Sequence, residues 1–139
     1  MAFLFDTDAI SEVLRRRPLP AYLHWLGAIP RADQFTSAVV VGELYKGAYR
    51  SANREFHLEQ ITARVVPAVT VLPYDAGVAR VYGEIDAYLH RLRLPLADAD
   101  LQIAATALHH GLELVTGNIR HFGRIPGLPI VRVLADARR

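Results

Sequence analysis

AFLFDTDAISEVLRRR, residues 2–17, joins a short apolar run to an amphipathic segment. The run at residues 2–5 stops at Asp6, which is typical of a buried parallel strand that ends in a polar turn. Apolar side chains then recur at helical spacing over residues 8–17, and Pro18 ends that helix. The chain therefore opens with a strand followed by a helix.

The same alternation continues to the end of the chain. Periodicity predicts further helices over residues 21–29, 39–52, 54–66, 75–92 and 98–110. Short apolar runs predict further strands at residues 35–37, 69–72, 112–116 and 130–134. This order is typical of an α/β fold. We expect a single domain over residues 1–139, with a mostly parallel sheet of about five strands covered by helices on both faces.

Composition excludes several classes of protein. With 139 residues, 52% of them hydrophobic, the chain suits one compact domain that buries roughly two-thirds of its unfolded surface. It has no cysteine, which rules out disulfides and Cys-based zinc sites and suits a reducing compartment. It also has no basic leader and no apolar run of about 20 residues, so we expect a soluble, cytoplasmic protein without a membrane span.

The basic residues are almost all arginines, since Lys46 is the only lysine among 16 basic residues. The guanidinium group is a planar fork that suits phosphate, so such a surface can support nucleic-acid binding. A GC-rich genome that favours arginine codons explains the bias equally well. Charge alone leaves both interpretations open.

Acidic side chains fall at the predicted strand ends and on the first turns of the helices that follow. Asp6 follows the first predicted strand. Glu43 lies near the start of the predicted helix at residues 39–52, and Asp100 lies in the first turn of the predicted helix at residues 98–110. Converging carboxylates repel one another unless a hard cation neutralises them, and Mg²⁺ or Mn²⁺ accepts such oxygen ligands. A bound ion of this kind activates water and orients phosphate, as phosphodiester cleavage requires. We predict that these three residues form the catalytic and metal-binding set.

Each of these residues also has an ordinary structural interpretation. Asp6 fits a helix N-cap, and acidic residues in a first turn, such as Asp98 and Asp100, are favoured by the helix dipole. Glu43 is harder to explain in this way, because its neighbours are so apolar that an unpaired buried carboxylate would cost several kcal/mol. Asp98, at the expected N-cap, is kept as a possible supporting ligand.

Further candidates flank this acidic set. Thr116 and Asn118 follow the fourth strand, although the sequence TGN around Asn118 is also a turn signal. Lys46 and Arg50 share a helical face with Glu43 and can contact RNA phosphates or simply form a solvated basic face.

Three segments in order resemble the motifs of a known family. FLFDTDAIS (residues 3–11), TSAVVVGELYKGA (36–48) and DADLQIAATALHHGLELVTGNIRHFGRIPGL (98–128) are similar to the acidic motifs of PIN-domain ribonucleases. Within that family they resemble the VapC-type toxins of prokaryotic toxin–antitoxin pairs. The resemblance spans nearly the whole chain and implies an endoribonuclease that cleaves RNA with metal-activated water.

The resemblance also assigns roles to individual residues. It places metal-binding acids on Asp6, Glu43 and Asp100, in agreement with the prediction from the residues alone. The family's fourth acidic position falls on Asn118, whose uncharged amide puts a second metal in doubt, with Asp98 as a possible substitute. Thr116 would orient a carboxylate or a metal-bound water.

The resemblance further implies partners. A cognate VapB-type antitoxin is expected to occupy the substrate groove, and homodimers and larger toxin–antitoxin complexes are typical of the family. The helices at residues 54–66 and 75–92 are the expected dimer interface.

Two rival functions use the same residues differently. In a haloacid-dehalogenase-type phosphatase, Asp6 would be the nucleophile and Asp8 the acid, but the only lysine shares a helix with Glu43 and the chain is short for that fold. Alternatively, the protein is a catalytically inactive PIN-fold module that binds RNA or antitoxin. The complete acidic set of Asp6, Glu43 and Asp100 argues against that alternative.

Overall fold

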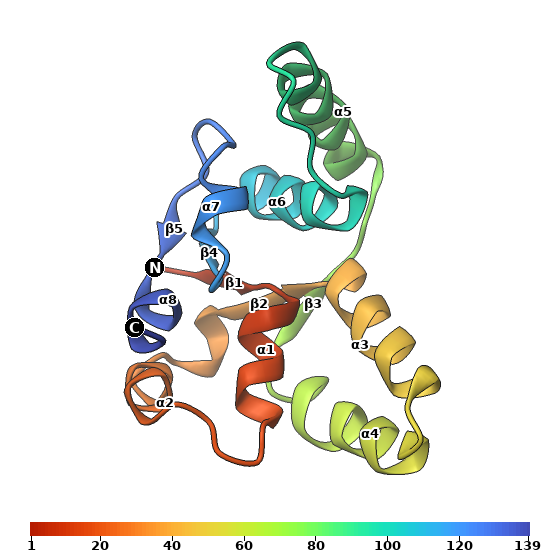
Figure 1. Ribbon diagram of the computed structural model, residues 1–139, viewed down its shortest axis with the longest axis vertical. Helices are drawn as coiled ribbons and strands as arrows, with labels where there is room; N and C mark the ends of the chain where they lie inside the picture. Colours follow the sequence, from red (N-terminus) through yellow and green to blue (C-terminus); the bar gives the residue numbers. More distant parts are fainter.

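Five parallel strands form a single sheet in the order β3-β2-β1-β4-β5 in the computed structural model, which describes residues 1–139 (Figure 1). The strands are β1 (Phe3–Phe5), β2 (Gln34–Ser37), β3 (Thr70–Leu72), β4 (Glu113–Val115) and β5 (Ile130–Val131). The predicted α/β architecture with a parallel five-stranded sheet is confirmed.

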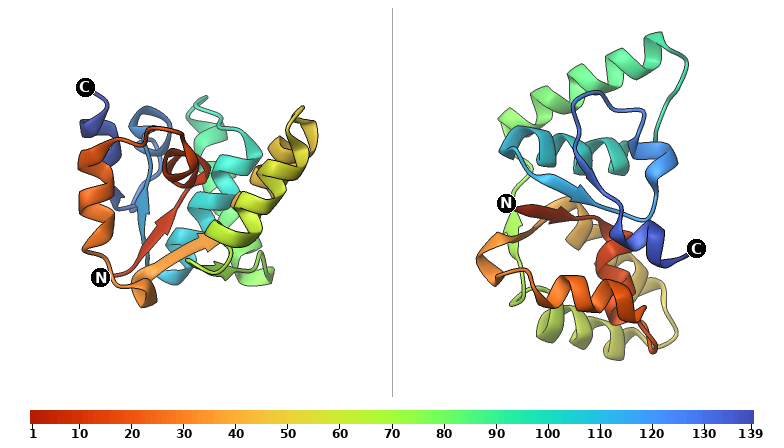
Figure 2. Two further views of the ribbon diagram at one scale, coloured as in Figure 1. Left: turned by 90° about the horizontal axis from the view of Figure 1, so that it is seen from below. Right: turned by 90° about the vertical axis from the view of Figure 1, so that its left-hand side faces the viewer.

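Helices cover both faces of this sheet. They are α1 (Thr7–Leu14), α2 (Pro20–Gly27), α3 (Ala38–Arg50), α4 (Arg54–Gln60), α5 (Ala76–Arg91), α6 (Asp98–His110), α7 (Ile119–Phe122) and α8 (Val133–Ala137). Helices α1, α2 and α4 lie on one side of the sheet and α5, α6 and α7 on the other, as Figures 1 and 2 show. Helix α3 contacts both α1 and α6, so it joins the two layers.

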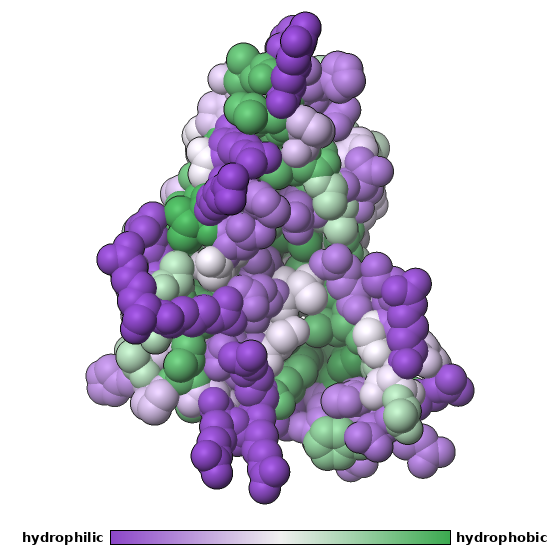
Figure 3. Space-filling view, viewed as in Figure 1, coloured by the Kyte–Doolittle hydropathy of each residue, from purple (hydrophilic) through white to green (hydrophobic).

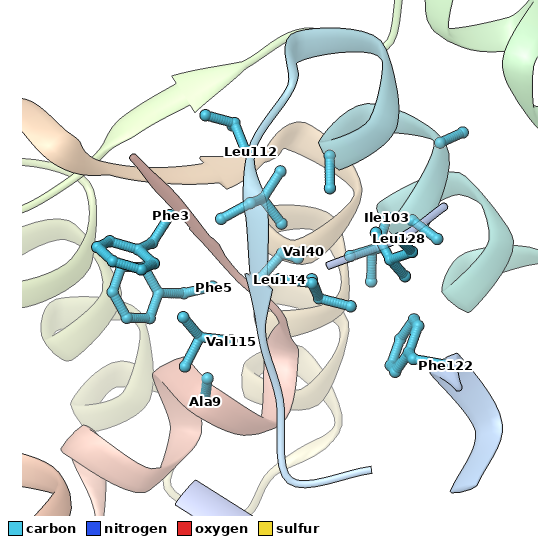
Figure 4. Close-up of a cluster of buried hydrophobic side chains, with 14 of the residues drawn as sticks. Phe3, Phe5, Ala9, Val40, Ile103, Leu112, Leu114, Val115, Phe122 and Leu128 are labelled. Carbon is cyan, nitrogen blue, oxygen red and sulfur yellow. The ribbon is translucent and has the colours of Figure 1, made fainter. Parts of the chain in front are cut away.

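The core is built around the two central strands. All three residues of β1 are buried, as are Leu114 and Val115 of β4, because these strands are covered on both faces. Figure 4 shows Phe3, Phe5 and Val115 on one face of the sheet, with Ala9 of α1, and Leu114 on the other face, with Ile103 of α6 and Phe122 of α7. No helix combines the length and the apolarity needed to cross a bilayer.

The largest error of the sequence prediction lies at the last strand, expected over residues 130–134. Pairing stops at Val131 because its partner strand β4 ends at Val115, and the chain then turns into α8. The predicted helix over residues 54–66 is likewise divided, because a π-helical turn, η2 (Ile61–Val65), follows α4. Gly111 ends α6 in the left-handed conformation at φ 66°, as its place in the sequence predicted.

Candidate active site

The strand order of the sheet changes direction between β1 and β4. From β1 the sheet grows through β2 and β3 on one side, whereas β4 and β5 extend it on the other. The carboxyl ends of these two central strands meet, and the Asp6 N–H donates to the Val115 carbonyl at 3.2 Å. A crevice at such a switch point is where open parallel sheets bind ligands.

Asp6 is held rigidly at this point. Its carboxylate caps α1 by accepting the Ala9 N–H at 2.8 Å, and the side chain is only 4% exposed. The pKa of Asp6 is raised to about 7. Burial is the main cause, hydrogen bonds from Thr116 and Ala9 oppose it, and the charges of Asp8 and Asp100 add to it. The capping role and a role in the site are therefore compatible.

Glu43 reaches the same region from α3. That helix begins after Ser37, whose hydroxyl accepts the Val39 N–H at 2.9 Å, so Glu43 lies on its second turn. The Thr7 hydroxyl donates a hydrogen bond to the Glu43 carboxylate. This contact joins α3 to the first turn of α1.

Asp100 lies in the first turn of α6 and is half-buried. Burial and then the nearby charge of Glu43 raise the pKa of its carboxyl, while His121 lowers it. Asp100 and Glu43 line the same cleft, from α6 and α3.

Asp98 points elsewhere, although it is only two residues away. It is exposed and accepts a hydrogen bond from the Tyr82 hydroxyl at 2.8 Å. The N-cap of α6 is Ala97 rather than Asp98, which is the first helical residue. Two residues correspond to a turn of about 200° around a helix, so Asp98 and Asp100 lie on nearly opposite faces.

A cleft of about 330 Å³ collects the acidic side chains from α1, α3 and α6. It is lined by Asp6, Thr7, Asp8, Ser11, Glu43, Asp100, Ile103, Asn118 and Phe122. No three acidic or histidine side chains lie close enough together to hold a metal ion in this arrangement. Even so, hard oxygen donors whose carboxyl pKa values are raised by burial and mutual repulsion suit a hard divalent cation.

The loop after β4 supplies the remaining wall. Asn118 caps the short helix α7, which the sequence did not predict, and its amide nitrogen lies 2.9 Å from His121 Nδ1. Its backbone N–H donates to the Thr116 hydroxyl at 2.9 Å, and that hydroxyl also bonds Asp6. Lys46 and Arg50, by contrast, are exposed and do not line the cleft.

Arg138 is a residue near the cleft that sequence reasoning missed. It lies 130 positions after Asp8, to which its guanidinium donates two hydrogen bonds. No spacing rule in the sequence connects such distant positions.

The model of the PIN domain family matches residues 3–128. The chain belongs to the PIN-domain family. It is 34% identical to toxin FitB of Neisseria gonorrhoeae, with 86% of this chain and 89% of that protein covered. It is 33% identical to the tRNA(fMet)-specific endonuclease VapC of Shigella flexneri, with 92% and 95% covered.

The fold of this PIN domain also matches a solved structure. VapBC2 from Rickettsia felis, bound to a DNA fragment from its promoter, superposes with a TM-score of 0.85 at 25% identity, covering 94% of this chain and 98% of that one. The predicted resemblance to VapC-type proteins is thereby confirmed. The haloacid-dehalogenase alternative for the Asp6-x-Asp8 pair is wrong.

Proposed function

We propose that this PIN domain is an endoribonuclease that depends on Mg²⁺ or Mn²⁺ and acts as the toxin of a toxin–antitoxin pair. The observation that carries the proposal is the meeting of Asp6, Glu43 and Asp100, from three separate segments, in one cleft at the switch point of the sheet. The names of the relatives from Neisseria and Shigella, a toxin and an endonuclease, support it.

The residues of the cleft have distinct roles in this proposal. Asp6, Glu43 and Asp100 hold the cation, which when bound stabilises charge on the phosphate and lowers the pKa of water. Thr116 and the Ala9 N–H fix the Asp6 carboxylate in one orientation.

Neighbouring side chains complete the site. Thr7 orients Glu43 through its hydroxyl, and Asn118 offers a neutral oxygen at the fourth position. Lys46 and Arg50 remain predicted RNA contacts. Because they are exposed on α3, they can contact phosphates of the RNA that lie outside the cleft.

An apolar groove beside the cleft supports an antitoxin partner. It has a volume of about 430 Å³, lies between α1, α3 and α4, and shares Thr7, Ser11 and Glu43 with the cleft. Its apolar lining is Leu14, Leu44, Ala48, Phe56 and Ile61. Figure 3 shows this hollow as green surface below the centre of the molecule. A segment of a VapB-type antitoxin seated here would reach the carboxylates and exclude RNA.

We further propose that the toxin forms a homodimer and larger complexes with its antitoxin. Tyr88 and Leu92, at the end of α5, are 38% and 49% exposed, which supports the predicted interface through that helix. Since RNA and antitoxin are intracellular molecules, the protein acts in the cytoplasm.

The nuclease is tested by incubating purified protein with labelled total RNA and Mg²⁺, Mn²⁺ or EDTA. Asp6→Asn is purified in parallel, and Asp86→Asn, an exposed acid on α5, is the matched control. We expect discrete fragments from wild type and Asp86→Asn only, and none with EDTA. Cleavage that persists in Asp6→Asn would point to a contaminating nuclease, and no cleavage at all would favour the inactive binding module.

A further inference from the structure

The C-terminal end of the chain brings a cation to the first turns of α1. The Arg138 guanidinium donates from Nη1 to Asp8 Oδ2 at 2.7 Å and from Nη2 to Asp8 Oδ1 at 2.9 Å. The same Nη2 donates to Glu12 Oε1 at 3.0 Å. Asp8 and Glu12 are one turn apart on α1, and Glu12 is fully buried, so Arg138 pairs with both acids of that helical face.

Asp8 is also part of the cleft. It lines the cleft beside Asp6, yet both of its carboxylate oxygens are engaged by the fork of Arg138. It is therefore held by a cation of the protein itself, whereas the carboxylates of Asp6 and Asp100 have no such partner. Asp8 is thus the acid of the cleft whose charge is already paired within the protein, unlike Asp6 and Asp100.

Gly117 makes room for this pair. A Cβ at position 117 would lie 2.4 Å from Arg138 Nη1 and 2.5 Å from Asp8 Oδ2. Gly117 stands between Thr116, which bonds Asp6, and Asn118, which lines the cleft. The ion pair thus packs against both walls of the cleft, the start of α1 and the loop after β4.

Resting on the proposed metal-dependent nuclease, we propose that Arg138 is a positioning residue, which withholds Asp8 from the bound cation and so confines the cation to Asp6, Glu43 and Asp100. Without Arg138, Asp8 turns toward the cation as an extra ligand. Its charge would then strengthen metal binding, whereas the altered set of carboxylates around the cation would support cleavage less well. The affinity for metal therefore rises while the rate of cleavage falls. A variant that simply failed to fold would lose both.

The inference is tested by Mn²⁺ binding, followed by electron paramagnetic resonance, beside RNA cleavage at saturating Mn²⁺. Arg138→Gln should bind Mn²⁺ about 5-fold more tightly, as expected for an unscreened charge near the site, and cleave at least about tenfold more slowly, as a displaced reacting group does. Arg132→Gln is the matched control, because Arg132 adjoins the same helix and makes only a long, exposed pair with Asp136 at 4.0 Å. It should match wild type in both measurements.

Two further variants keep the test decisive if Arg138→Gln fails to fold, as judged by circular dichroism. Gly117→Ala retains every charge but displaces the pair, and should shift Mn²⁺ affinity and cleavage in the same directions as Arg138→Gln. In an Asp8→Asn background, Arg138→Gln should raise Mn²⁺ affinity much less than it does in the wild type.

An equal effect of Arg138→Gln with and without Asp8 would overturn the inference, as would weaker Mn²⁺ binding in Gly117→Ala. Wild type that binds Mn²⁺ but cleaves no RNA would refute the nuclease alone, since the binding measurements still decide the role of Arg138. Wild type that binds no Mn²⁺ would refute both.

Discussion

The Thr7 hydroxyl bonds the Glu43 carboxylate across 36 positions of the chain, and Thr7 directly follows Asp6. The hydrogen bond therefore fixes the distance between two predicted metal ligands. Thr7→Val preserves shape but removes the donor, so Glu43 loses its orientation. We expect the rate of RNA cleavage to fall about tenfold, the equivalent of one hydrogen bond of about 1.4 kcal/mol.

Single-turnover cleavage of a defined RNA measures this effect. Thr62→Val is the control, because the Thr62 hydroxyl bonds only the Leu58 carbonyl on an exposed helix. Equal rates for wild type and Thr7→Val would mean that the contact does not position Glu43.

The stability of the metal-free protein should depend on the ionisation of Asp6. Burial raises the pKa of this carboxyl from 3.8 to about 7, so the folded state holds a proton that the unfolded state has released between these values. The contribution of Asp6 to stability is therefore fullest below about pH 4 and falls as pH rises toward 7. Asp6→Asn abolishes this dependence while retaining a good N-cap.

Thermal melts of both proteins between pH 5 and pH 8 measure the difference. We expect Asp6→Asn to be more stable at pH 8, by between about 1 and 4 kcal/mol, the upper limit being the full shift at 1.36 kcal/mol per unit. Saturating Mn²⁺ should restore the wild type and leave the variant unchanged. A difference that is constant with pH would show that Asp6 does not titrate in this range.

The two acids at the start of α6 should behave differently. Asp100 faces the cleft, whereas Asp98 accepts a hydrogen bond from the Tyr82 hydroxyl outside it. We expect Asp100→Asn to lower RNA cleavage by at least about 100-fold, the range typical for an essential electrostatic group. Asp98→Asn should stay within about twofold. Similar losses in both variants would make Asp98 a supporting ligand, as the sequence alone allowed.

Local sequence predicts most of what shapes this site. The apolar run that ends at Asp6 predicted β1 and its polar end, and the apolar surroundings of Glu43 singled out that carboxylate. Both signals are local, because a buried parallel strand and a carboxylate among apolar neighbours can each be recognised from adjacent residues. In the structure Glu43 is half-buried. That both side chains enter one cleft follows from the switch point of the sheet.

The parts that the sequence did not predict depend on distant contacts. The end of β4 limits β5 and lets α8 form, although residues 130–134 alone favour a strand. Arg138 looks like an ordinary terminal arginine until α8 brings it to Asp8. Gly117 looks like a turn residue, whereas its missing side chain is what accommodates that pair.

Glu12 should matter for stability rather than for chemistry. Its carboxylate is fully buried and accepts hydrogen bonds from Arg138 at 3.0 Å, from the Leu19 N–H at 3.1 Å and from Arg15 at 3.2 Å. Burial alone would raise the pKa of Glu12, but these hydrogen bonds and charges lower it below its usual value. The side chain thus fastens α1 to the α1–α2 loop and to the C-terminus.

Glu12→Gln removes the charge while two arginines and a backbone N–H still converge on the site. We expect the free energy of unfolding at pH 7 to fall by about 2 kcal/mol, below the range for fully buried pairs because both arginines are partly exposed. Glu84→Gln is the control. Its exposed pair with Arg80 should contribute less than about 0.5 kcal/mol.

The stabilisation by Glu12 should also depend on pH. Because the pKa of Glu12 is lowered in the folded state, its contribution to stability is present above the pKa of the unfolded state and disappears as pH falls through the pKa of the folded state. The stabilities of wild type and Glu12→Gln should therefore converge in acid. A gap between their urea midpoints that persists at low pH would mean that the amide disturbs packing rather than charge pairing.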